Sequence, residues 1–280
     1  NRFQINLRNL SVVQIAAGSA ILPTLPESGF ANYFDDQRFG SVSGGRFIAR
    51  EMVFERYEEA LKLALVEPYE HDRESAKSEK EILRKHWGDW PTCLAKLPRG
   101  HAQQIIAHLR REPTDFRGAC VRLQPDLQGL YLSVWQSYLW NRILDRWLTD
   151  HLPTENLQSI TLKTGRLVVP RQVPLELKQE WAELELPLPS ARLNFVADAP
   201  WATAVNSVFT EEGLTLADMR LRGLRKPFFS KGNRTAKVPV SELTWEVRPD
   251  ELQPGKQQLR LRFELPRGCY ATMLLKTLLG

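Results

Sequence analysis

The sequence contains little cysteine and no long uninterrupted apolar stretch. Its 3 cysteines, Cys93, Cys120 and Cys269, are an odd number and lie far apart, so they predict neither a disulfide framework nor a zinc site. No segment reaches the roughly 18 apolar residues of a membrane-spanning helix. His101 and His108 do not share a helix face well enough for a metal pair. We therefore expect a protein of the reducing cytoplasm, without metal or membrane contact.

The bulk composition is that of an ordinary globular protein. Hydrophobic residues make up 42% and charged residues 25% of the 280 residues, which suffice for one large or two modest domains. Lysine and arginine number 38 against 33 acidic residues, giving a net charge of +5. This charge permits a polyanionic partner without requiring one.

Acidic residues are absent from one long segment, 219–240. Phe228 and Phe229 lie among its basic residues, and Gly223 and Gly232 loosen the backbone. Basic residues interleaved with aromatic residues and glycine are typical of RNA binding; the alternative is an exposed cationic loop. We predict contacts with the RNA backbone for the basic residues of the segment, which are Arg220, Arg222, Arg225, Lys226, Lys231, Arg234 and Lys237.

The hydrophobic pattern predicts strands near both ends of the chain and helices between them. Apolar residues alternate with polar ones in the predicted strands, which are 3–7, 242–247 and 258–265. A hairpin is predicted about Thr164 and Gly165. Helical spacing predicts helices over 11–20, 46–66, 102–111, 129–152, 202–216 and 271–279, the first stopped by Pro23 and Pro26. This order indicates an α+β layer interrupted by a mostly helical insert.

The segment Asn32 to Gly40 (NYFDDQRFG) fits neither an amphipathic helix nor an alternating strand. An amide at Asn32 and a ring at Phe34 would share one face of an extended segment. Proteins hold unstacked bases with such pairs, because the ring stacks and the amide bonds the base edge. Gln37 and Arg38 could face a phosphate. A polar loop with two core phenylalanines is the alternative.

Three ordered motifs resemble the TruD family of pseudouridine synthases. They are Asn32–Gly40, the helical run Gln136–Arg142 (QSYLWNR) and the C-terminal run Leu265–Thr272 (LPRGCYAT). The resemblance covers essentially the whole chain. It implies a pseudouridine-synthase-like mixed or antiparallel sheet with helices, interrupted by a TruD-specific insert. Residues 1–45 and 238–280 would then be parts of the catalytic domain, and 46–237 the insert.

The resemblance also implies an activity. Family members convert uridine to pseudouridine in tRNA, typically at position 13 in the D-arm, without cofactor or metal. The uracil would stack on Phe34 in a cleft between the two domains, and Asn32 would hold the loop or the base edge. We expect tRNA as the partner and a monomeric protein. The implied substrate-binding residues are Asn32, Phe34, Gln37, Arg38, Leu265, Arg267, Gly268 and Tyr270.

The nucleophile implied by the resemblance has no match in this sequence. The family's catalytic aspartate lies in a glycine-x-lysine-aspartate-arginine-like motif, before the strand that 3–7 resembles. We therefore expect it in an N-terminal segment absent from this chain, and we expect residues 1–280 alone to be inactive. A non-catalytic tRNA-binding protein and an enzyme split over two chains remain alternatives.

Overall fold

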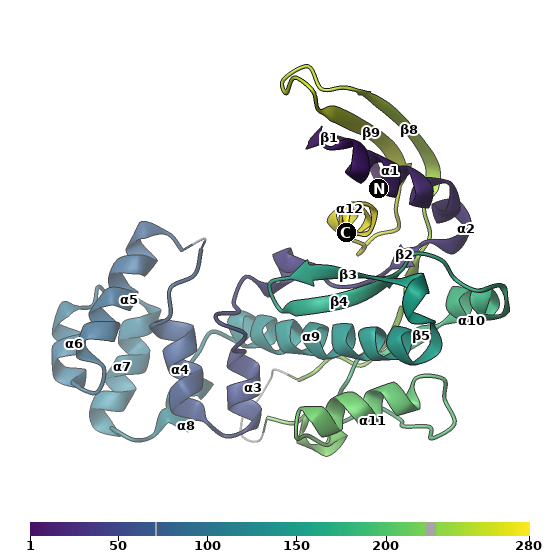
Figure 1. The fold of residues 1–280 in the computed structure, drawn as a ribbon. Helices are drawn as coiled ribbons and strands as arrows, with labels where there is room; N and C mark the ends of the chain where they lie inside the picture. Colours follow the sequence, from purple (N-terminus) through teal and green to yellow (C-terminus); the bar gives the residue numbers. More distant parts are fainter. Residues whose placement is uncertain (71, 222–227) are drawn as a thin grey trace.

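The computed structural model describes residues 1–70, 72–221 and 228–280. Figure 1 shows three parts: a curved sheet with helices α1 and α12 beside it, a central body around the long helix α9, and a lobe of short helices near the N-terminal end of α9. The bounds of these helices are Val12–Ile21 for α1, Ala271–Leu279 for α12 and Pro125–His151 for α9.

The sheet joins the two ends of the chain. Its strands are antiparallel in the order β1-β9-β8. Phe3 pairs with Phe263, and their rings stack with centroids 5.4 Å apart. Alternate residues of β9, such as Leu261, are buried while Arg262 is exposed, which confirms the three predicted strands. The bounds are Arg2–Leu10 for β1, Ser241–Pro249 for β8 and Gln257–Glu264 for β9.

Helix α1 begins where the sequence predicted. It ends at Ile21, and two short helical segments follow it. Ser11 accepts a hydrogen bond from the Gln14 backbone, and the Gln14 side chain accepts one from Ser11, which forms a capping box. The predicted stop at the prolines is confirmed for α1, which ends at Ile21 before Pro23. The chain continues as a 3-10 turn and then as α2 (Leu25–Ser28), because a proline in a first turn needs no N–H partner.

Helix α9 forms the centre of the body. Trp135, Trp140 and Trp147 along it are fully buried. The hairpin of β3 (Leu157–Leu162) and β4 (Gly165–Pro170) lies on one side of α9, and α11 (Ala202–Glu211) lies on the other (Figure 1). The predicted hairpin and the predicted helices over 129–152 and 202–216 are confirmed, the last ending earlier than expected.

One predicted helix, 46–66, is two helices in the structure. The break falls after α3, where Glu55 has a left-handed φ of 58°, a conformation that continues no right-handed helix. The second helix, α4, opens the lobe of short helices. The bounds are Ile48–Val53 for α3, Tyr57–Leu65 for α4, Glu74–His86 for α5, Trp90–Lys96 for α6, His101–Arg111 for α7 and Phe116–Val121 for α8.

Short strands connect the sheet to the body. Gly29 precedes them with a φ of 60°, and a Cβ there would lie 2.4 Å from the Val238 carbonyl oxygen, so glycine is required. The pairs are β2 (Phe30–Ala31) with β7 (Lys237–Val238), and β5 (Glu185–Pro187) with β6 (Asn233–Thr235); helix α10 (Lys178–Glu183) precedes β5. Within the described part of the chain, no helix is both long enough and apolar enough to cross a membrane.

Candidate functional site

The backbone of Phe34 in the Asn32–Gly40 loop is fixed against α9 by one side chain, that of Asn141. The Asn141 amide oxygen accepts a hydrogen bond from the Phe34 backbone N–H at 2.9 Å, and its amide nitrogen donates to the Phe34 carbonyl at 2.8 Å. Asn141 is almost completely buried. Both polar groups of the Phe34 backbone are therefore satisfied, and the position of the Phe34 ring is set by the helix.

The half-buried Phe34 ring lies among aromatic and cationic groups. The guanidinium carbon of Arg234 lies 4.2 Å from the ring centroid, and that of Arg38 lies 5.7 Å away. Trp140 and Tyr270 meet the ring edge to face, with centroids 5.6 and 6.4 Å away. The loop, α9, β6 and the C-terminal motif thus converge on one side chain.

Arg234 is held in this place by neutral acceptors. It donates to the carbonyl and the side-chain oxygen of Asn32 and to the Gly268 carbonyl. Burial lowers its pKa from the ordinary value. Among residues 1–70, 72–221 and 228–280, neither Arg234 nor Arg38 forms an ion pair with a carboxylate. Two guanidinium groups near the ring therefore keep an uncompensated positive charge.

The Asn32 side chain is already engaged within the protein. Its amide nitrogen donates to the Thr235 carbonyl at 2.8 Å, and its oxygen accepts from Arg234. The residue is 3% exposed. Asn32 therefore links the loop to the strand that carries Arg234.

Sequence reasoning missed the group that holds the two carboxylates of the loop. Lys276 on α12 donates to Asp35 at 2.6 Å and to Asp36 at 2.7 Å, and Thr272, one turn earlier, donates to Asp35. Burial raises the pKa of Asp35, but the hydrogen bonds from Lys276 and Thr272 outweigh it and hold this pKa below its ordinary value. The four-residue spacing of Thr272 and Lys276 on a predicted helix was the available signal.

The predicted substrate-binding residues do not all lie together. Gln37 is exposed beside Arg38, and Tyr270 and the Gly268 carbonyl lie at the Phe34 site. Arg267 is exposed on the same turn. Leu265, in contrast, is 2% exposed and belongs to the core.

The basic segment does not form one uniform face. Arg220 and Lys231 are exposed, whereas Arg234 lies at Phe34 and Lys237 donates to the Glu27 carbonyl at 2.7 Å. Burial lowers the pKa of Lys237. The predictions for Arg222, Arg225 and Lys226 fall outside the described residues.

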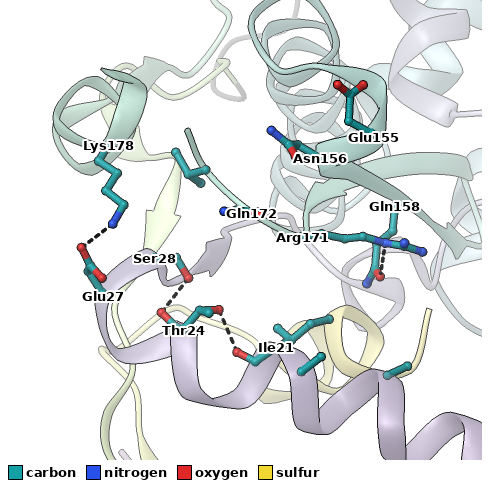
Figure 2. A pocket seen from close by; sticks show the side chains of 13 residues that line it. Ile21, Thr24, Glu27, Ser28, Glu155, Asn156, Gln158, Arg171, Gln172 and Lys178 are labelled. Carbon is teal, nitrogen blue, oxygen red and sulfur yellow. Dashed lines mark hydrogen bonds and ion pairs between the residues drawn. The ribbon is translucent and has the colours of Figure 1, made fainter. Parts of the chain in front are cut away.

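A hollow of about 570 Å³ lies between α1–α2 and the β3–β4 hairpin with α10. Figure 2 shows Glu27 and Lys178 pointing toward each other across it, 2.7 Å apart, and Arg171 beside Gln158. None of the predicted substrate-binding residues lines this hollow. The aromatic site at Phe34 is therefore separate from it.

The described residues contain no group of three or more histidine, cysteine or acidic side chains placed to hold a metal ion. What they contain is a flat ring beside two guanidinium groups without a carboxylate partner, an arrangement that suits an aromatic base with a neighbouring phosphate. Fold and site thus define an α+β protein with an aromatic and cationic cluster around Phe34.

Comparisons with known proteins identify the family. The model of the family "tRNA pseudouridine synthase D (TruD)" matches residues 1–278, so the chain belongs to the TruD family. A protein of Methanococcus maripaludis named "Probable tRNA pseudouridine synthase D 1" is 28% identical over 99% of this chain and 71% of its own length. The tRNA pseudouridine synthase D of Leptospira interrogans is 26% identical over 100% of this chain and 69% of its own length.

A crystal structure confirms the fold. The Methanosarcina mazei protein named "Putative tRNA pseudouridine synthase D (TruD)" matches with a TM-score of 0.74 and 25% identity, over 100% of this chain and 68% of that chain. The predicted α+β class, with helices and small antiparallel sheets, is confirmed. The chain spans about two thirds of the length of its relatives, for example 66% of one from Methanocaldococcus jannaschii and 64% of one from Methanopyrus kandleri.

Proposed function

We propose that this chain is part of an isomerase that converts uridine to pseudouridine in tRNA, at position 13 of the D-arm, and that Phe34 carries the unstacked uracil. Membership of the TruD family supports the reaction. One observation supports the position of the uracil at Phe34. The ring is flanked by two guanidinium groups with no carboxylate partner among the described residues.

In this proposal the uracil stacks on the face of Phe34 opposite Arg234. Arg234 is anchored by hydrogen bonds to Asn32 and Gly268, so replacing it with a base would break them. A base on the opposite face completes a stack of guanidinium, ring and base, in which the cation attracts the π-electrons of the ring. Base–aromatic stacking contributes about 1–3 kcal/mol.

The other residues of the site act around this stack. Asn32 holds the loop and Arg234 rather than the base edge, because its side chain is already bonded to both neighbours. The exposed Gln37 and Arg267 and the half-buried Arg38 face the RNA strand. Arg220 and Lys231 contact the RNA backbone further along.

Asp35 and Asp36 are not the nucleophile in this proposal. A nucleophilic carboxylate must approach the reacting carbon to within about 3.5 Å, and Lys276 ties both carboxylates to α12. Their role is to fix the loop. We further propose that 1–45 and 238–280 are parts of the catalytic domain and that 46–237 is the insert, since the flanks build the β1-β9-β8 sheet with α1 and α12.

Substituting Phe34 tests the site. In the intact protein, Phe34→Ala should weaken tRNA binding by about 1–3 kcal/mol through lost stacking, whereas Phe34→Tyr, which keeps a flat ring, should retain most of the affinity. Titration of labelled tRNA measures both variants. Phe195→Ala is the control, because Phe195 is also half-buried and meets one aromatic ring, that of Trp201.

Thermal melting separates the two possible roles of Phe34. A large drop in melting temperature with unaltered tRNA affinity would show that Phe34 is a core residue and would contradict the proposed site.

A further inference from the structure

A second hollow adjoins the Phe34 site on the far side of Arg38. Its volume is about 410 Å³, within the range of pockets that hold small organic groups. One wall comes from α9 through Leu130, Tyr131 and Val134, and Arg38 and Gln37 lie at the edge nearest Phe34. Arg38 thus borders both the aromatic site and the hollow.

The opposite wall is aromatic and charged. The Lys80 ammonium lies 4.3 Å from the centre of the Tyr69 ring and 2.6 Å from an Asp72 carboxylate oxygen. Asp72 also accepts a hydrogen bond from the Tyr69 backbone at 2.8 Å. These bonds order the wall, although partial burial of the ion pair costs desolvation free energy.

The apolar wall is left partly uncovered. Leu130 is 43% exposed, although Tyr131 and Val134 beside it are buried. Among the described residues, no hydrogen bond is found for the exposed Gln37 amide, and Arg38 donates through Nε to Ser137 while its two terminal nitrogens make no such bond. An apolar surface beside a free amide and a free guanidinium edge suits a planar group that carries polar edges and an adjacent anion.

We propose that this hollow binds the base of the nucleotide next to the target uridine in the RNA strand, with the phosphate between the two nucleotides on Arg38. The proposal rests on the proposed function and adds a second base-binding site to it. Arg38 borders both sites, so a phosphate on it lies between their occupants, and a phosphate is the group that joins consecutive nucleotides. Proteins that bind single strands combine cationic groups along the backbone with surfaces for successive bases in this way.

An abasic scan tests the proposal. Single nucleotides along the D-arm strand of tRNA are replaced one at a time by abasic residues, and affinity for the intact protein is measured. We expect wild-type protein to lose roughly tenfold in affinity at two adjacent positions. In Phe34→Ala, an abasic residue at one of these positions should cause no further loss of affinity. Leu130→Asp places a carboxylate at the wall of the hollow, and it should abolish the loss at the neighbouring position.

Two further variants complete the experiment. Leu130→Trp fills the hollow without adding charge and should act like Leu130→Asp. Leu252→Asp makes the same charge change at a leucine that is 68% exposed in the β8–β9 connection, and should behave as wild type.

The outcomes distinguish the two proposals. If the Leu130 variants keep wild-type sensitivity at every position, or lose it at a position not adjacent to that of Phe34, the second site is overturned. If Phe34→Ala changes no position while Leu130→Asp changes one, the proposed role of Phe34 fails and RNA binding in the hollow stands. Equal weakening by Leu252→Asp would show a general charge effect and would also overturn the second site.

Discussion

At the scale of residues, the site depends on which charges are compensated. Lys276 compensates Asp35 and Asp36, and Arg38 and Arg234 have no carboxylate partner among the described residues. The sequence places Arg38 and both aspartates in one loop. It could not assign their partners, because Lys276 lies 241 residues after Asp35. Pairing over such a distance is decided by the fold.

Removal of Lys276 should destabilise the protein strongly. Lys276→Met leaves the buried Asp35 without its cation; breaking a fully buried pair costs about 3–5 kcal/mol, and because the Lys276 side chain is 27% exposed the loss should lie at or below the lower end of that range. Urea unfolding at neutral pH measures the loss. Lys178→Met is the control, since its pair with Glu27 is exposed and should contribute little to stability. Equal losses in both variants would contradict the account.

The same pair predicts a pH dependence. The pKa of Asp35 is lowered on folding, so its contribution is complete above the unfolded value of about 3.9 and is lost as the pH falls through the lower folded value. In Lys276→Met, burial without a cation raises the pKa of Asp35 instead. The stability of this variant therefore increases as the pH falls through that raised value. The difference in unfolding free energy between wild type and variant should therefore shrink from pH 7 to pH 4; a constant difference would exclude this linkage.

At the scale of elements, hydrophobic periodicity predicted most of the fold. It located the strands of the sheet, the hairpin and α9, because apolar spacing reports which face is buried. It failed at α3 and α4, because the break at Glu55 is a left-handed conformation of a residue that is not glycine, and no sequence signal marks it. For the site, the amide and ring of Asn32 and Phe34 indicated the loop, but nothing in the sequence indicated that Asn141 on α9 positions it.

Asn141 provides a test at this scale. Asn141→Leu leaves the partly buried N–H and C=O of Phe34 unbonded, at about 1–3 kcal/mol for each group, and should weaken tRNA binding because the ring is no longer fixed. Gln128→Leu is the control, since Gln128 is also buried on α9 and donates to backbone carbonyls, including that of Leu123. Stability should fall in both variants, and tRNA affinity in Asn141→Leu alone. Equal affinities would show that α9 does not position the site.

At the scale of the whole molecule, charge distribution governs RNA binding. Arg220 and Lys231 are exposed and should contact phosphates. Arg234 and Lys237, in contrast, are half-buried and donate hydrogen bonds to backbone carbonyls. Replacing Arg220 and Lys231 together by alanine should weaken binding to all tRNAs alike. The slope of log affinity against log salt is negative, and its magnitude should decrease by about 2, roughly one for each lost phosphate contact.

The matched control removes two other exposed cationic residues, Lys96 at the end of α6 and Lys256 between β8 and β9. These substitutions should leave the slope almost unchanged. The same slope for wild type and for the Arg220 and Lys231 variant would contradict a role of this segment at the RNA backbone.

Pseudouridine formation in tRNA is the most direct test of the central claim, that Phe34 holds the uracil of a tRNA during its isomerisation. Purified full-length protein that contains residues 1–280 is incubated with unmodified tRNA, and pseudouridine is mapped after carbodiimide treatment, for wild type, Phe34→Ala and Phe195→Ala. The account predicts pseudouridine at position 13 with wild type and Phe195→Ala, and a rate at least about fivefold lower with Phe34→Ala, as the loss of about 1 kcal/mol or more of stacking implies. Absence of pseudouridine with folded wild-type protein, or an unchanged rate with Phe34→Ala, would contradict it.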